Sequence, residues 1–188
     1  MNKKVIVAGY LGALLIGGSL GANADDQGAG NHYVLNLVGT GAMYDGLVPD
    51  IDGDGHDDPA ICFDVNLVDM LNQRNAGTAT DCLSNVTPTG TGVALVGTTY
   101  FNLPQGELVV RGNTTVQPVF HPTVTPAEQT ITHITGAASP DNAVISGTRN
   151  FAGAEGTVRL SGMVDMTNFN GNVGDPISFD CLFVVDLK

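Results

Sequence analysis

A run of closely spaced aspartates, DIDGDGHDD at residues 50–58, is the sharpest chemical signal in the sequence. Aspartates two positions apart can direct carboxylate oxygens to one centre, and a glycine after the third allows the tight turn of a calcium loop. Positions 1, 3, 5, 6 and 9 of the run match the start of an EF-hand loop, but position 12 is Ile61 instead of a bidentate glutamate. We therefore expect a weak structural calcium site and no organic cofactor, the alternative being a solvated acidic turn. The expected ligand residues are Asp50, Asp52, Asp54, His56 and Asp58.

Charged residues within strand-like stretches form a second group of candidates, because charge inside a folded domain is costly unless it is paired or used. They are Arg159, Arg111, Glu107 and His133. If these side chains converge in a shared interior, Glu107 or His133 could move a proton while an arginine stabilises developing negative charge. Such an arrangement would suit an isomerisation or a ring closure. The alternative is that the apolar face of each strand points inward and the four side chains are exposed to solvent.

Alternating apolar residues predict the strands that would position these groups. In 156–166, Val158, Leu160 and Val164 share one face and Arg159 lies on the other, and the same period recurs in 177–187. Gly, Thr, Val and Asn are abundant and Lys is scarce, which favours an all-β domain. We expect about eight antiparallel strands, with the first paired to the last so that the sheet has no free edge. The other expected strands are 32–38, 60–69, 78–84, 93–103, 106–113, 128–135 and 143–146. We expect an irregular connection at 39–59, a loop at 85–92 and an irregular or edge segment at 115–124.

The three cysteines allow three pairings, and the hairpin formed by 60–69 and 78–84 favours one of them. Folding this hairpin about Asn72 places Cys62 opposite Cys82, because each lies ten residues from the turn. Directly opposed Cβ atoms of an antiparallel pair are close enough for a disulfide. We therefore expect a Cys62–Cys82 disulfide. Cys181, on the more apolar face of the last strand, is expected to be a buried and inert thiol.

The run GTRNFAGAEG at 147–156, followed by the strand at 158–164 and an apolar C-terminal strand, resembles the allene oxide cyclase and dirigent superfamily. Members carry a Gly-Thr-Gly-x-Phe-x-x-Ala-x-Gly turn before the penultimate strands, and this chain departs from it at Arg149. The resemblance covers the last third of the chain and, more weakly, 93–119. It implies a single eight-stranded antiparallel closed barrel and, since members often form trimers, a homotrimer. Because members include cyclases, proteins that steer radical coupling and secreted proteins of unknown role, it does not select one activity.

The first residues have the pattern of a secretory signal peptide, which would end at Ala24. Lys3 and Lys4 precede an apolar run at 5–20, and Ala22-Asn23-Ala24 fits the small-x-small cleavage pattern. We therefore expect a signal peptide at 1–24, a barrel domain at 25–188, and a secreted or periplasmic location. The apolar run is shorter than the roughly 20 residues of a membrane span, so no span is expected in the mature chain. Without this segment, five basic residues face nineteen acidic ones, a net charge of −14 that disfavours nucleic acid as a partner.

Two classes of function are consistent with these observations. One is a barrel that holds a hydrophobic small molecule, as a cofactor-independent cyclase or isomerase or as a stereochemical guide. The other is a non-catalytic extracellular protein, stabilised by calcium and a disulfide, that has a structural or interaction role. An interior pocket with polar groups would favour the first class, and an interior filled solid with apolar side chains would favour the second.

Overall fold

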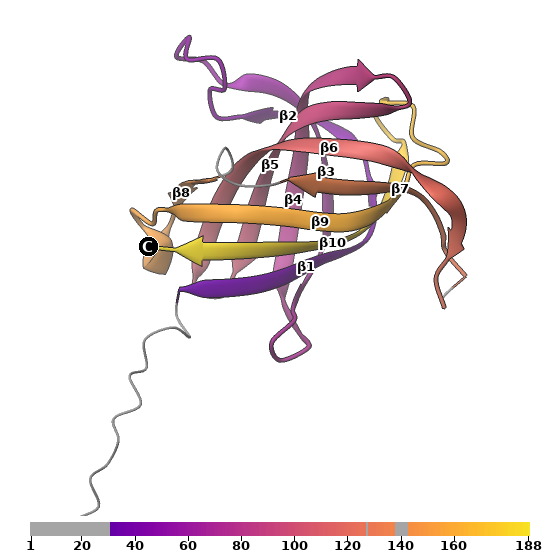
Figure 1. Cartoon of the computed structure of the whole chain (residues 1–188). Coiled ribbons are helices and arrows are strands. Elements are labelled where there is room, and N and C mark those ends of the chain that lie inside the picture. Colours follow the sequence, from indigo (N-terminus) through magenta and orange to yellow (C-terminus); the bar gives the residue numbers. More distant parts are fainter. Residues whose placement is uncertain (1–30, 127, 138–142) are drawn as a thin grey trace, which may run out of the picture.

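The computed structural model describes residues 31–126, 128–137 and 143–188, and the predicted signal peptide at 1–24 lies outside them. Within these ranges the chain is all-β, as predicted, with a single 3-10 turn, η1 (Arg149–Phe151). No helix in this described part is long and apolar enough to cross a membrane. The strands are β1 (His32–Ala42), β2 (Tyr44–Val48), β3 (Asp58–Asp69), β4 (Arg74–Thr89), β5 (Gly92–Leu103), β6 (Gly106–Val124), β7 (Thr130–Ala137), β8 (Ala143–Gly147), β9 (Gly156–Asp165) and β10 (Pro176–Leu187) (Figure 1).

Eight of these strands are hydrogen-bonded in a ring, which we call the strand ring. Its order is β1-β10-β9-β7-β6-β5-β4-β3, and β3 pairs back with β1 between residues 66–69 and 35–38. The antiparallel ladder of β1 and β10 runs from His32 opposite Asp186 to Ala42 opposite Pro176, which confirms the predicted pairing of the first and last strands. β2 pairs with β3 outside this path, and β8 pairs with β6 and β9. Figure 1 shows β1, β10 and β9 side by side across one wall.

Large apolar side chains on the inner faces of the strands form the main core. Phe101 packs edge to face against Phe183 with ring centroids 5.3 Å apart, and Phe63 packs in the same way against Phe179 at 5.2 Å. Leucines and valines of β1, β3, β6, β9 and β10 complete the cluster. The alternation of the sequence therefore places every second side chain of these strands inside the strand ring.

A second, smaller apolar cluster lies outside the strand ring, where β2 pairs with the edge of β3. It contains Val48, Ala60 and the two half-cystines, with Ile51 and Tyr100 packed against them. Cys62 and Cys82 are directly opposed in the β3–β4 ladder and form the predicted disulfide. This bridge is compatible with an extracellular location, since disulfides persist in oxidising compartments.

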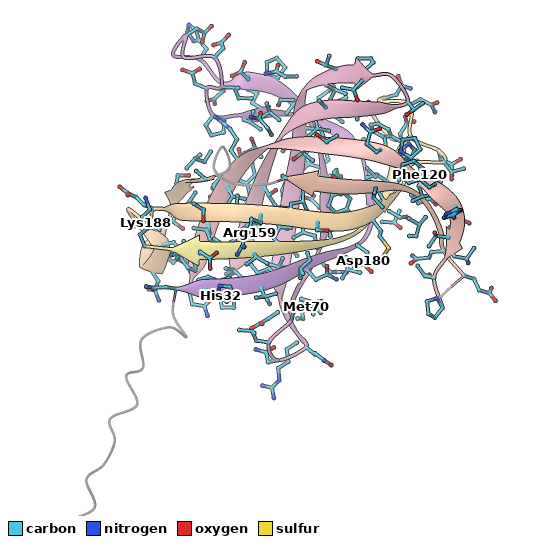
Figure 2. The ribbon with its side chains drawn as sticks, viewed as in Figure 1. His32, Met70, Phe120, Arg159, Asp180 and Lys188 are labelled. Atoms are coloured by element: carbon cyan, nitrogen blue, oxygen red, sulfur yellow. A yellow bond between two sulfur atoms is a disulfide. The ribbon has the colours of Figure 1, made fainter. Side chains whose placement is uncertain are left out.

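Three connections differ from the sequence-based expectation. Residues 39–59 contain strand β2 instead of being wholly irregular, and β4 continues to Thr89 through the stretch expected to be a loop. Residues 115–124, expected to be an irregular or edge segment because of their prolines and His121, belong to β6, which pairs with β7 across a register shift between Pro118 and Thr123. The shift lets the strand continue past its prolines, which cannot donate to the ladder. Phe120 in this extension is 94% exposed and projects from the ribbon (Figure 2).

Candidate functional site

An apolar cavity of about 50 Å³, which we call the inner cavity, lies between the inner faces of β4, β5, β6, β7, β9 and β10. Most of its lining consists of aliphatic and aromatic side chains, including Leu95, Val110, Leu160, Val164 and Phe183. The strand ring is therefore not filled solid. The inner cavity is large enough for several water-sized groups, because one such group needs roughly 10–15 Å³ of this kind of space.

A larger pocket of about 420 Å³, the mouth pocket, adjoins the inner cavity. Five residues line both spaces, so the two spaces adjoin along a shared wall. They are Leu83, Val86, Val93, Met166 and Phe169. Asn170 and Gly171 of the β9–β10 connection and Ile61 of β3 complete the mouth pocket. We call the two adjoining spaces together the apolar passage, and their linings extend from the loop at 166–171 to the inner faces of the strand ring.

Asp81 is the acidic residue that lines the inner cavity. It lies on β4 between Ala79 and Leu83, and only 4% of its surface is exposed. The Thr99 hydroxyl donates a 2.6 Å hydrogen bond to Oδ1, and within the described ranges Oδ2 has no protein donor. Burial raises the pKa of the Asp81 carboxyl to about 7 from an ordinary 3.8, and the Thr99 hydrogen bond lowers it in part. Near neutral pH the site therefore holds a carboxyl that can exist in either protonation state.

Cys181 of β10 faces the same interior as Asp81. Burial raises the pKa of its thiol, and the Asp81 charge raises it further. The sulfur packs over Gly162, where a Cβ would lie 2.2 Å from Sγ, and it donates a 3.7 Å hydrogen bond to the Met163 carbonyl. The expectation that Cys181 is a buried thiol is confirmed. With its pKa raised, the thiol stays protonated at neutral pH and is a poor nucleophile.

Three threonines also line the inner cavity: Thr99, Thr114 and Thr135. All three are buried, with at most 7% of their surface exposed. Thr114 donates a long 3.5 Å hydrogen bond to the Gly112 carbonyl, so its oxygen can still accept one. Apart from Arg111, whose guanidinium binds the Asp50 and Pro49 carbonyls, the polar residues of the lining offer one carboxyl and a few hydroxyl oxygens in an otherwise apolar wall.

The structure does not bring the four predicted catalytic residues together. Arg159 lies on the outer surface of β9, with 57% of its side chain exposed, and donates a 2.9 Å hydrogen bond to Asp186 (Figure 2). His32 lies 2.5 Å from the other oxygen of Asp186, and this contact, followed by the charges of His32 and Arg159, lowers the pKa of the Asp186 carboxyl. Arg159 is thus not inward-facing, because Val158 and Leu160 on either side of it occupy the inner face.

Arg111 also directs its guanidinium away from the interior. Arg111 is among the residues that border the inner cavity, together with its β6 neighbours Val110 and Gly112, but the partners of its guanidinium lie on the other side of the strand. Its Nη1 donates a 2.9 Å hydrogen bond to the Asp50 carbonyl, its Nη2 binds the Pro49 carbonyl, and its Nε donates to Thr98 at 3.2 Å. Arg111 therefore holds the beginning of the acidic loop against the outside of the strand ring.

Glu107 and His133 are placed apart from each other and from the inner cavity lining. Glu107 borders a surface hollow next to the β5–β6 turn and η1, and the Thr148 hydroxyl accepts a 3.0 Å hydrogen bond from its backbone N–H. His133 is half-buried on β7, opposite Val164, and its Nδ1 lies 2.9 Å from the Thr132 hydroxyl. The structure therefore does not bring an acid or base together with an arginine, and the exposed Arg159 matches the alternative in which the apolar face of the strand points inward.

Asp81 is the site residue that the sequence analysis missed. A signal for it was present, because Asp81 is in phase with Ala79 and Leu83 and so interrupts an apolar face with a carboxyl. The stretch 78–84 contains too few apolar residues for the pattern to show which face is buried. Only the pairing with β3 and β5 assigns Asp81 to the interior.

Three carboxylates of the acidic loop form a cluster that could hold a metal ion. Asp50, Asp52 and Asp58 place one oxygen each within 4.8 Å of one another, while Asp54 and His56 are not part of this group. Both oxygens of Asp50 accept backbone hydrogen bonds, from Gly53 at 2.6 Å and Gly55 at 2.8 Å. These hydrogen bonds lower the pKa of the Asp50 carboxyl, and the bond from Gly55 has the larger effect.

The loop conformation depends on the glycines of the aspartate run. Gly53 has φ of 84° and Gly55 has φ of 87°, in the left-handed region that favours glycine. With the chain turned in this way, the Asp58 carboxylate accepts a 2.5 Å hydrogen bond from the Ile51 backbone N–H, which joins the two ends of the loop. The turn predicted from the glycine spacing therefore gathers three of the five predicted ligand residues.

The sequence matches no protein-family model and is similar to no curated protein.

Proposed function

We propose that this protein is a secreted or periplasmic closed β-barrel, of the allene oxide cyclase and dirigent type, that binds a small hydrophobic molecule. The observation that carries the proposal is the apolar passage formed by the mouth pocket and the inner cavity. The ring of eight paired strands supports a closed barrel, since small barrels of this strand number can hold one ligand. The disulfide supports an extracellular location.

The size and chemistry of the passage suit a small apolar ligand. The mouth pocket, at about 420 Å³, lies within the range of about 300–1,000 Å³ that is typical of small-molecule sites. Each methylene group that enters it would gain about 0.8 kcal/mol. Affinity would therefore come from the hydrophobic effect, and orientation from the few polar groups of the inner cavity.

A cyclase or isomerase would need more than binding, because it must orient a reactive substrate and in many cases move a proton. The inner cavity supports the first requirement through its fixed apolar walls. Asp81 supports the second, because a carboxyl with a pKa near 7 can donate or accept a proton at neutral pH. Binding is the activity that the geometry supports best, and catalysis would be an extension of it through Asp81.

A dye titration tests the binding proposal. The neutral hydrophobic dye N-phenyl-1-naphthylamine should become fluorescent on binding to the purified protein, because it leaves water for the apolar passage. Val93→Phe fills the place where the two spaces join and should weaken binding by about ten-fold or more. Val124→Phe, at an exposed position outside both linings, is the matched control and should bind like the wild type. Equal binding by wild type and Val93→Phe, or no binding at all, would refute the proposal.

A structural role for calcium is the second candidate, and the three-carboxylate cluster favours it. Calcium prefers carboxylate and carbonyl oxygens, and extracellular modules bind it at about 10⁻⁴–10⁻³ M. We propose that an ion held by Asp50, Asp52 and Asp58 would rigidify the loop next to the smaller apolar cluster that contains the disulfide. This role is compatible with ligand binding, because the loop and the passage lie on opposite sides of the strand wall.

A further inference from the structure

We propose that the hydrophobic ligand carries a protonated amine on a short, narrow chain, and that this ammonium group binds Asp81 while the bulky part stays in the mouth pocket. The inference rests on the proposed binding function and adds the chemical class of the ligand. It is argued from the shape of the passage, the partners of Asp81 and the charge of the molecule.

The two spaces differ about eight-fold in volume. A ligand that occupies both should therefore have a bulky part in the mouth pocket and a narrow chain in the inner cavity. The mouth pocket holds about 420 Å³ and the inner cavity about 50 Å³. Asp81 lies two residues beyond Leu83 along β4, a distance of about 7 Å at the usual rise of a strand. A chain of about three to five non-hydrogen atoms spans that distance and fits a space for about four water-sized groups. A ring system must remain in the mouth pocket.

Asp81 is unusual because its carboxyl group is buried and, among the described residues, accepts a hydrogen bond from a single donor. Thr99 satisfies Oδ1, and the described part of the chain offers no donor to Oδ2. A buried carboxylate in this state is expensive, and a ligand that supplied both a donor and a positive charge would remove that cost. A hydrocarbon tail supplies neither, and an alcohol supplies only the donor. The ammonium group is therefore the best match to the free oxygen.

The surroundings also suit the other hydrogens of an ammonium group. It carries three donors, and the hydroxyl oxygens of Thr99, Thr114 and Thr135 line the same cavity as acceptors. No cationic side chain competes for Asp81 among the described residues, since the guanidinium of Arg111 binds loop carbonyls outside. The formal net charge of −12 adds a long-range attraction for cations.

The groups that face Asp81 set its pH response. Phe63 is opposite it on β3 and Thr99 on β5, and neither titrates in the working range. Cys181 of β10 does titrate, but burial raises its pKa, so it remains a neutral thiol. The affinity for an amine should therefore rise with pH as Asp81 loses its proton, while the affinity for a hydrocarbon should stay constant.

Three probes of equal size test this inference: 3-phenylpropylamine, 3-phenylpropan-1-ol and butylbenzene, which end in an ammonium, a hydroxyl and a methyl group. Their affinities are measured by displacement of N-phenyl-1-naphthylamine near neutral pH. The amine should bind at least about ten-fold more tightly than butylbenzene, the equivalent of one additional charge-assisted hydrogen bond. Asp81→Asn, which keeps the shape and removes the charge, should abolish this preference, so that the amine no longer binds more tightly than butylbenzene to that variant.

Asp180→Asn is the matched control, because it removes an exposed carboxylate on the outer face of β10 (Figure 2). It should keep the preference for the amine, which separates a bound ammonium from general attraction to an acidic protein. Equal affinities for the three probes, an alcohol that binds as tightly as the amine, or a preference that survives in Asp81→Asn would each overturn the inference and leave the binding function standing. Failure of the dye and of all three probes to bind would overturn the binding function as well.

Discussion

Asp81 and Asp50 are the same side chain in opposite settings, separated by one wall of the strand ring. Asp81 lies among apolar side chains with one hydroxyl donor, and its pKa is raised to about 7. Asp50 lies in an exposed loop, its carboxylate accepts two backbone N–H groups, and its pKa is lowered. The difference shows that the number of donors and the access of water decide which protonation state each residue favours.

The two settings also suit different partners. The Asp50 carboxylate is charged at neutral pH and lies with Asp52 and Asp58, a combination suited to an oxygen-seeking cation at the surface. Asp81 is alone in an apolar space and suits an organic ligand that brings its own charge or hydrogen-bond donor. Four experiments test this contrast.

The largest effect is expected from Asp81→Asn. Because the folded-state pKa of about 7 exceeds the ordinary 3.8, the native state binds more protons between these values, and its stability falls as pH rises through this window. The loss is on the order of 4 kcal/mol and is complete above about pH 7. Asp81→Asn should remove this pH dependence. The stability of the variant relative to the wild type should therefore be higher at about pH 8 than at about pH 4. Urea unfolding at both pH values measures this, and a difference that does not change with pH would contradict the interior setting of Asp81.

Arg111→Met should have the next largest effect, on the outer side. It removes the guanidinium that binds Pro49, Asp50 and Thr98, and hydrogen bonds from charged groups are worth about 1.5–3 kcal/mol. We expect a loss of about 2 kcal/mol in the free energy of unfolding, with dye binding unchanged. Arg111→Lys, which keeps the charge without the forked geometry, should recover only part of the loss. If either variant also lost dye binding, the loop and the passage would have to be coupled.

Calcium should produce a smaller stabilisation that depends on the acidic cluster. With a dissociation constant near 0.5 mM, about 5 mM calcium would add about 1.4 kcal/mol and raise the melting temperature by about 3 °C. Asp52→Asn should abolish the gain, whereas Asp54→Asn, whose side chain lies outside the cluster, should keep it. Identical melting curves with calcium and with a chelator would show that the cluster is a solvated acidic turn.

Arg159→Ala should have the smallest effect, because its ion pair with Asp186 is exposed. Such pairs contribute less than about 1 kcal/mol. Since the pKa of Asp186 is lowered in the folded state, the contribution should be present at neutral pH and disappear as the carboxyl is protonated in acid. Dye binding should not change. A loss of dye binding in Arg159→Ala would show that Arg159 belongs to the binding site and would contradict its placement on the outer face.

Local patterns predicted the strands and one cross-link. The alternation in 156–166 and 177–187 predicted β9 and β10, and the equal distance of Cys62 and Cys82 from the hairpin turn predicted the disulfide. The glycine spacing in the aspartate run likewise predicted a tight turn, which now gathers Asp50, Asp52 and Asp58. These features depend on residues close in sequence, so their geometry follows from the backbone itself.

Three features could be predicted from the sequence alone: the two chemically different faces of each strand, the strands that are neighbours across short turns, and the position of the acidic turn. The face that forms the inside could be assigned only from the folded sheet. That choice depends on pairings between distant strands, such as β1 with β3 and β10, which bend the sheet so that one face becomes enclosed. The folded sheet places Arg159 outside and Asp81 inside, although both are charged residues in strands. Which face of a strand is buried depends on the pairing of the whole sheet and not on the single residue.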